Sequence, residues 1–217
     1  MDFWRILWLW CGALLVAIVA IVACVRWIDY PVAIMFLNAS KHAGPIGEIF
    51  GGRVLVAGEL LLISVLAIFR LRNGNLPELA KICLVACTTS VMAYTLNYVV
   101  LKFVFGRQNP AAYYQSHIAG TFHLFRGDDG SSFPSGHMML AAAFLGVFIR
   151  LYPRARIASL FLLVVAAVAM VAGDWHYVSD LIAGAFLGLT AGLMAGELWL
   201  RHIARWRSQD GLAKLTS

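Results

Sequence analysis

Long apolar runs separated by short polar segments dominate the pattern along this chain. A helix needs about 20 apolar residues to cross the hydrocarbon core of a bilayer. Six runs approach or reach this length, and they cover about residues 6–25, 54–69, 82–101, 135–149, 157–172 and 178–200. The pattern predicts an all-α fold: a polytopic membrane protein whose six transmembrane helices form one bundle and a single domain over residues 1–217.

The last apolar run carries a regular series of glycines. Gly184, Gly188, Gly192 and Gly196 recur every four residues, and residues four apart share one face of an α-helix. Small residues on one face allow a neighbouring helix backbone to approach closely. We therefore expect this face to pack tightly against another helix.

The basic residues predict the orientation of the bundle. An even number of spans leaves both termini on one side of the membrane. If both termini are cytoplasmic, eleven of the 17 Lys and Arg residues fall on the cytoplasmic side and six on the outer side. The positive-inside rule favours this arrangement. It places two long loops, at about residues 26–53 and 102–133, on the outer face.

The composition supports a membrane protein and excludes other classes. Hydrophobic residues make up 61% of the chain and charged residues 13%, with a mean hydropathy of +0.80. Soluble domains have about 45–50% apolar and about 25% charged residues. Disorder, a collagen-like fibre and a soluble nucleic-acid-binding protein are therefore excluded. The net charge of +6 fits basic loops beside anionic lipid headgroups. All four cysteines lie inside apolar runs and are expected to act as small apolar side chains: Cys11, Cys24, Cys83 and Cys87.

A first polar block closes the third apolar run. It contains Lys102, Gly106, Arg107, Asn109 and Pro110. Gly106 and Pro110 predict a turn that ends the helix. The two cations could extend to lipid headgroups, as basic residues at a membrane edge commonly do, or they could bind an anionic substrate.

A second block, Pro134-Ser135-Gly136-His137, opens the fourth run. The first N–H groups of a helix have no partner inside it and, together with the helix dipole, favour a bound anion. Ser135 would add a hydroxyl, and His137 would lie beside the anion. The alternative is an ordinary N-cap without further function.

A third block lies between the fifth and sixth runs, where His176 precedes Asp180 by four residues. This spacing places both side chains on one face of a helix, so the carboxylate can bind one imidazole nitrogen. The other nitrogen is then available as a nucleophile or base. A hydrogen bond that only stabilises the start of the helix is the alternative.

The three blocks share one position in the expected topology. Each lies at the outer end of a span, so all three can meet in one layer at the outer membrane surface. Two histidines, one of them oriented by a carboxylate, together with two cations and a helix N-terminus are typical of a phosphoryl-transfer site.

The blocks resemble the signature of the type 2 phosphatidic acid phosphatase superfamily of membrane enzymes. That signature is Lys, six residues, Arg-Pro; then Pro-Ser-Gly-His; then Ser-Arg, five residues, His, three residues, Asp. Lys102 and Pro110 match the first block, residues 134–137 match the second in full, and His176 and Asp180 match the third. The six spans and the placement of the blocks agree with the family as well.

Both family arginines are replaced in this chain. Asn109 stands where the first block has Arg, and Ala169-Met170 stands where the third has Ser-Arg. In the family both arginines bind the phosphate. Arg107 and Arg126 are the candidates to replace them.

The resemblance implies a lipid phosphatase that hydrolyses a phosphate monoester or pyrophosphate. It would act at the outer, periplasmic or extracytoplasmic, face of the cell inner membrane. His176, oriented by Asp180, would attack phosphorus and form a phosphohistidine, and His137 would protonate the leaving oxygen. The substrate-binding groups would be Lys102, Arg107, Asn109, Ser135 and Gly136. The partners would be the lipid phosphate and membrane lipids, without nucleic acid, a metal or another cofactor.

Other functions stay open at this point. A sphingomyelin-synthase-like lipid phosphotransferase, which moves a phosphate or phospho-headgroup to an acceptor alcohol, fits a site with fewer arginines, because a diester carries less charge than a monoester. The run from Asp128-Asp129 to His137 is loosely similar to that group. An inactive scaffold would explain the lost arginines, and a transporter would explain Glu59. A zinc site at His137, His176 and Asp180 is opposed by Lys102 and Arg107.

Overall fold

The computed structural model describes residues 3–40, 52–110, 122–128 and 130–213. Apart from one isolated bridge between Arg107 and Phe122, the regular secondary structure of these residues is helical. The α-helices are α1 (Phe3–Ala23), α2 (Asp29–Ser40), α4 (Gly52–Asn73), α5 (Glu78–Leu96), α6 (Lys102–Phe105), α8 (Gly136–Leu151), α9 (Arg156–Ala172) and α10 (Val178–Ala213). Short π-helices at Cys24–Ile28 and Asn97–Leu101 join α1 to α2 and α5 to α6, and a 3₁₀ turn at Pro153–Ala155 precedes α9.

Several of these helices can cross a membrane. Five described segments are long and apolar enough, namely Leu7–Phe36, Gly52–Asn73, Glu78–Phe105, Pro153–Ala172 and Val178–Arg205, and α8 is a shorter apolar helix. Large apolar side chains on α1, α4 and α9 are exposed, as expected of surfaces that face lipid. The expected all-helical, apolar fold is confirmed for the described residues. The count of six spans stays a prediction.

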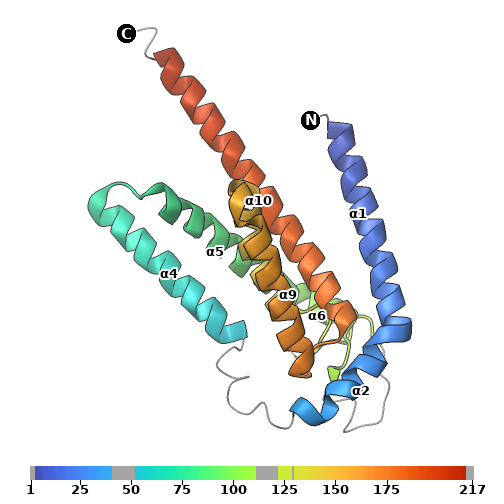
Figure 1. The fold of residues 1–217 in the computed structure, drawn as a ribbon. Helices are drawn as coiled ribbons and strands as arrows, with labels where there is room; N and C mark the ends of the chain where they lie inside the picture. The colour runs from blue at the N-terminus through green and yellow to red at the C-terminus, as the bar shows by residue number, and fades with distance from the viewer. Residues whose placement is uncertain (1–2, 41–51, 111–121, 129, 214–217) are drawn as a thin grey trace.

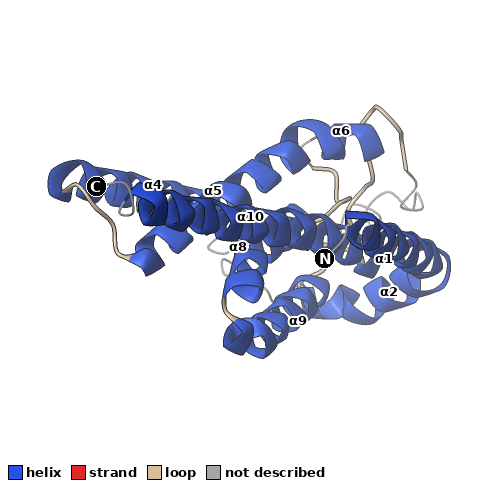
Figure 2. Ribbon diagram, turned by 90° about the horizontal axis from the view of Figure 1, so that it is seen from above, coloured by secondary structure: helices blue, strands red, loops and turns tan. Residues whose placement is uncertain are grey.

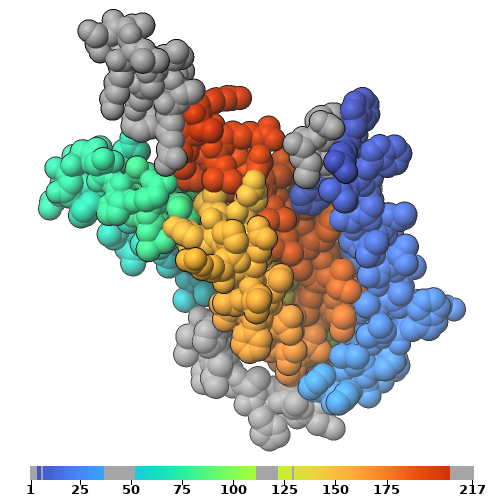
Figure 3. All heavy atoms as spheres, turned by 45° about the horizontal axis from the view of Figure 1, so that its top comes forward, coloured from blue at the N-terminus to red at the C-terminus, as the bar shows by residue number. Residues whose placement is uncertain are grey.

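The core of the bundle is built around α8. This helix packs against α5, α9 and α10 (Figure 2), and Met138, Ala142, Ala143 and Val147 on it are buried. Figure 3 shows α9 and α10 in the middle of the molecular surface, with α1 on one side and the α4–α5 pair on the other. The start of α8 is therefore held from several sides.

The regularly spaced glycines form the contact between α10 and α8. A Cβ atom at Gly184 would lie 2.5 Å from the Ser135 carbonyl oxygen, and one at Gly188 would collide with the Met139 carbonyl oxygen. In the same way, a Cβ atom at Gly192 would lie 2.9 Å from the Cα of Gly146. The close packing predicted from the spacing is thus present. We call Gly184, Gly188, Gly192 and Gly196 the glycine ladder.

The described ends of the chain lie at one end of the molecule. The start of α1 and the end of α10 point the same way in Figure 1, whereas α2, α6 and the start of α10 gather at the opposite end. Both described chain ends therefore lie at the same end of the bundle, and the side of the membrane on which they lie stays a prediction. The middle parts of both long loops, with Lys41 and Asp129, lie outside the described residues.

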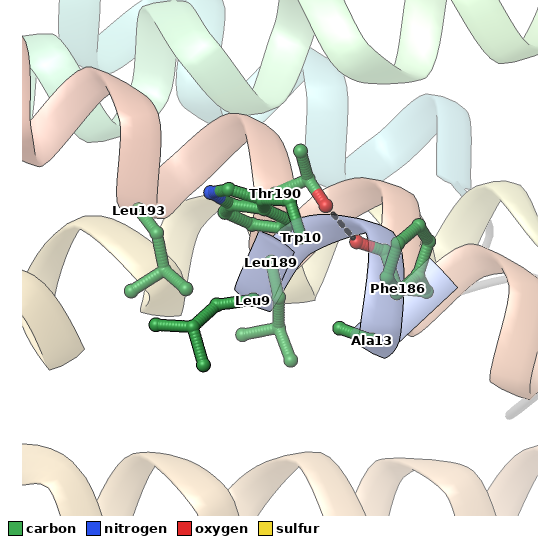
Figure 4. Close-up of a pocket in the computed structure, with 7 residues that line it drawn as sticks. All are labelled: Leu9, Trp10, Ala13, Phe186, Leu189, Thr190 and Leu193. Carbon is green, nitrogen blue, oxygen red and sulfur yellow. Dashed lines mark hydrogen bonds between the residues drawn. The ribbon is translucent and has the colours of Figure 1, made fainter. Parts of the chain in front are cut away.

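An apolar cavity of about 350 Å³ lies between α1 and α10 (Figure 4). Its lining is apolar except for Thr190, whose hydroxyl donates to the Phe186 carbonyl oxygen at 2.7 Å. Thr190 is ten residues beyond Asp180, or about 15 Å along the helix. This cavity is therefore separate from the polar cluster at the start of α10.

Candidate active site

Ser135 joins the second and third polar blocks. It is the N-cap of α8, and its hydroxyl oxygen accepts the Met138 N–H at 3.3 Å. Its own N–H donates to the Asp180 carbonyl oxygen at 3.0 Å, and its hydroxyl lies 3.8 Å from the Met170 sulfur. The start of α8 is thereby fixed to the start of α10. The hydroxyl expected to bind an anion is engaged in these internal contacts.

The two histidines of the blocks face each other. The ring centres of His137 and His176 are 5.9 Å apart, and the Trp175 ring lies 6.0 Å from that of His137. The Nε2 atom of His137 is buried without a hydrogen-bond partner among the described residues. Buried polar atoms are rarely left unpaired in folded proteins. An unpaired imidazole nitrogen beside a second imidazole is therefore a place where a polar ligand group would fit.

Asp180 lies beside His176, but not through the shared helical face expected from their spacing, because His176 precedes the first residue of α10, Val178. The Asp180 Oδ2 atom is 3.6 Å from His176 Nδ1 and accepts the Tyr177 N–H at 3.0 Å. The Asp180 side chain is completely buried. At this distance of 3.6 Å, His176 Nδ1 faces the carboxylate without a hydrogen bond among the described residues, and Nε2 is the nitrogen on the other side of the ring.

Arg107 enters the same region from the first block. Gly106, at φ 49°, takes the left-handed conformation that ends α6, and the following guanidinium is buried. Its Nη1 donates to Asp180 Oδ1 at 2.7 Å and to Ser179 Oγ at 2.6 Å, and its Nη2 donates to Asp29 Oδ2 at 2.8 Å. Burial disfavours the charged guanidinium, but Asp180 and Asp29 outweigh burial and raise the pKa of Arg107 above its ordinary value.

Asp29, which no sequence motif pointed to, joins the contacts around Arg107. It opens α2 directly after the Cys24–Ile28 π-helix, and such π segments often occur at functional sites. Its carboxylate accepts the Ser179 N–H at 3.0 Å and the Ser179 hydroxyl at 2.5 Å. A signal was available, because Asp29 is a single acidic residue inside a long apolar segment.

The other expected binding residues differ in exposure. Lys102 is half-buried 6.0 Å from the Tyr98 ring centre, and its charge acts on His137. Gly136 is buried against Tyr94. Asn109 is half-buried and Arg126 is exposed. Met170, which stands where the family signature has Arg, is buried. No described residue group of three or more His, Cys, Asp or Glu has the geometry to hold a metal ion.

Sequence comparisons relate the chain to known proteins. The family model described as the PAP2 superfamily matches residues 79–207. Two curated relatives, both named lipid A 1-phosphatase, are 29% identical to the chain and align with 88% of it. The match covers 82% of the Rhizobium johnstonii protein and 86% of the Rhizobium etli protein. No solved structure matches the chain.

Proposed function

Because the chain belongs to the PAP2 superfamily, we propose that it is an integral membrane phosphatase for a lipid phosphate monoester or pyrophosphate. The observation that carries the proposal is the meeting of His137, His176 and Asp180 at the start of α8 and α10. These are the residues through which the chain matches the family's second and third blocks. The site would lie on the outer face of the cell inner membrane, opposite the cytoplasmic termini.

The proposed reaction has two steps. His176 Nε2 attacks phosphorus, the bond from phosphorus to the leaving oxygen breaks, and His137 donates a proton to that oxygen. His137 then removes a proton from water, which attacks the phosphohistidine and releases phosphate and free His176. Asp180 orients the imidazole of His176 through Nδ1 and stabilises its charged form. The 3.6 Å distance between His176 Nδ1 and Asp180 Oδ2 supports this role.

The phosphate would be held by groups around the two imidazoles. Lys102 supplies positive charge beside His137, and the N–H groups of Gly136 and His137 lie in the first turn of α8, where a helix favours an anion. Asn109 is a further candidate donor. The apolar tails of the substrate would remain among the helices and lipid.

The substrate class is suggested by the relatives. Both are named for lipid A 1-phosphatase activity, so a phosphorylated glycolipid of the outer leaflet is the first substrate to test. Phosphatidate, phosphatidylglycerophosphate and polyprenyl pyrophosphate complete the panel.

The test is an assay of purified protein against this panel in mixed micelles. Free phosphate and newly formed phospholipid are measured together, with His176→Ala as the matched inactive control. Release of phosphate by the wild type alone supports the phosphatase. Equal release by wild type and variant, or no release from any lipid, rejects it.

A lipid phosphotransferase is the second candidate, and Met170 favours it. The family has Arg at this position, and here a buried thioether lies 3.8 Å from Ser135 Oγ, so a dianionic monoester has one cation fewer to bind. Transfer would appear in the assay as new phospholipid when an acceptor alcohol is added. Restoring the first family arginine by Asn109→Arg should hold or raise monoester hydrolysis by a phosphatase. It should bring no gain to a diester transferase.

A further inference from the structure

A buried ion cluster lies behind the proposed catalytic pair. We define it as Asp29, Arg107, Ser179 and Asp180, whose side chains are all at most 3% exposed. Its members come from α2, from the segment after α6, and from the first turn of α10. Three parts of the chain that are distant in sequence are therefore joined at one point.

The donors of Arg107 are directed into this cluster. Three of the five guanidinium N–H groups are engaged by Ser179, Asp180 and Asp29, at 2.6, 2.7 and 2.8 Å. The guanidinium carbon also lies 4.0 Å from the centre of the Tyr177 ring. Two carboxylates already pair with the buried guanidinium, and breaking either ion pair in favour of a phosphate would be costly. The contacts of Arg107 therefore favour a role other than the phosphate grip expected from the sequence.

The two oxygens of Asp180 have separate tasks. Oδ1 accepts from Arg107, whereas Oδ2 accepts the Tyr177 N–H and faces His176 Nδ1. Arg107 thereby fixes the rotation of the carboxylate that orients the imidazole. Asp29 in turn fixes Arg107 from the other side and binds both the N–H and the hydroxyl of Ser179.

We propose that Asp29 and Arg107 are positioning residues that hold Asp180, and through it His176, in the reactive orientation. The proposal rests on the proposed function. It also assigns a role to the N-terminal helices, because Asp29 lies outside residues 79–207, the part that matches the family model. The catalytic arrangement of this chain is then incomplete without α2.

The test compares Asp29→Asn and Arg107→Met with a matched control, Glu59→Gln. Glu59 is another partly buried carboxylate between helices, bonded by the Ser90 hydroxyl at 3.0 Å, and it takes no part in the site. We expect kcat to fall about tenfold or more in both cluster variants, as is usual when a residue that orients a reactive group is removed. KM should change little, and Glu59→Gln should keep the wild-type kcat.

The pH profile separates positioning from simple destabilisation. Loss of the Arg107 cation favours a protonated imidazole beside Asp180, so the acid limb of kcat/KM should move to higher pH in Arg107→Met. Loss of the Asp29 anion should move it to lower pH in Asp29→Asn. The other charged or titratable groups that the structure describes at this point, Asp180, Tyr177, His137 and Lys102, are unchanged in both variants. Unchanged profiles, with melting temperatures lowered as in the control, would show that the cluster only stabilises the fold.

A second measurement does not depend on turnover. Mass spectrometry measures how fast diethyl pyrocarbonate modifies His176 at each pH. The pH at which this rate rises should move to higher pH in Arg107→Met, to lower pH in Asp29→Asn, and stay unchanged in Glu59→Gln. A wild type inactive on every lipid would reject the proposed function, and this rate would still decide the positioning role. If Asp29→Asn does not fold, the shift in Arg107→Met alone decides the proposal. An unshifted rate overturns the proposal.

Discussion

His176 and Asp180 meet through one oxygen that also serves the backbone. Asp180 Oδ2 accepts the Tyr177 N–H at 3.0 Å while it faces His176 Nδ1. The backbone contact prevents the carboxylate from turning away, so the imidazole has a fixed partner. An amide in place of the carboxylate would keep the shape and lose the charge.

This pairing leads to a graded prediction. His176→Ala should abolish turnover, and Asp180→Asn should lower kcat about a hundredfold or more, because the charged imidazole loses its counter-ion. Alkaline quenching of the wild type during turnover should leave phosphate on His176, detectable by mass spectrometry. Phosphate bound at His137 instead would reverse the roles of the two histidines.

Asp174 predicts a pH dependence of stability. It follows α9 with a φ of 58° and is 3% exposed, and burial raises the pKa of its carboxyl from 3.8 to about 6. Between these values the folded protein holds a proton that the unfolded chain releases. The contribution of the protonated Asp174 carboxyl to the free energy of unfolding is therefore fully present below the pKa of the unfolded chain, and it is lost as pH rises through the pKa of the folded protein.

Asp174→Asn should remove this loss. In detergent, the melting temperature of the variant relative to the wild type should be higher near pH 7 than near pH 4. A difference that stays constant over this range would mean that the carboxyl does not hold its proton in the fold.

At the scale of elements, the contact between α8 and α10 sets the position of the site. Because Ser135 and Asp180 lie at the adjoining ends of these helices, any separation of the helices also separates His137 from His176. The glycine ladder keeps the two backbones in contact, with no room for a methyl group at Gly188.

Gly188→Ala should therefore lower the melting temperature. Overpacking of this kind costs about 1–3 kcal/mol, and the activity should fall with it as the histidines move apart. Gly12→Ala is the matched control, because a Cβ atom there has nothing within 4 Å. Equal melting temperatures and activities of Gly188→Ala and Gly12→Ala would contradict the close packing.

The parts of the site that follow from the sequence are the local ones. The cap at Ser135 depends on one helical turn, and His176 and Asp180 are only four residues apart, so residue types and spacing bring them to notice even though His176 lies before α10 begins. Asp29 binds Ser179 across 150 residues of chain, and no local pattern records that contact. In the same way the sequence shows the cationic side chain of Arg107 but not its two carboxylate partners, Asp29 and Asp180.

At the scale of the whole molecule, the site and the described chain ends lie at opposite ends of the bundle (Figure 1). The excess of basic residues on the side of the termini predicts that these face the cytoplasm. A green fluorescent protein fused after Ser217 should therefore fluoresce, whereas an alkaline phosphatase fused there should be inactive. The reverse result would place the site on the cytoplasmic face.

The order of the ion cluster along the chain also implies an order of biogenesis. Asp29 and Arg107 precede α10 in the chain, so both opposite charges are synthesised before the last helix. Their pairing at that stage spares each an isolated charge at the bilayer edge. The same pair then offers a carboxylate and N–H donors to Ser179 and Asp180 as they arrive. Translation of the final helix would thus complete the fold and the catalytic pair in one event.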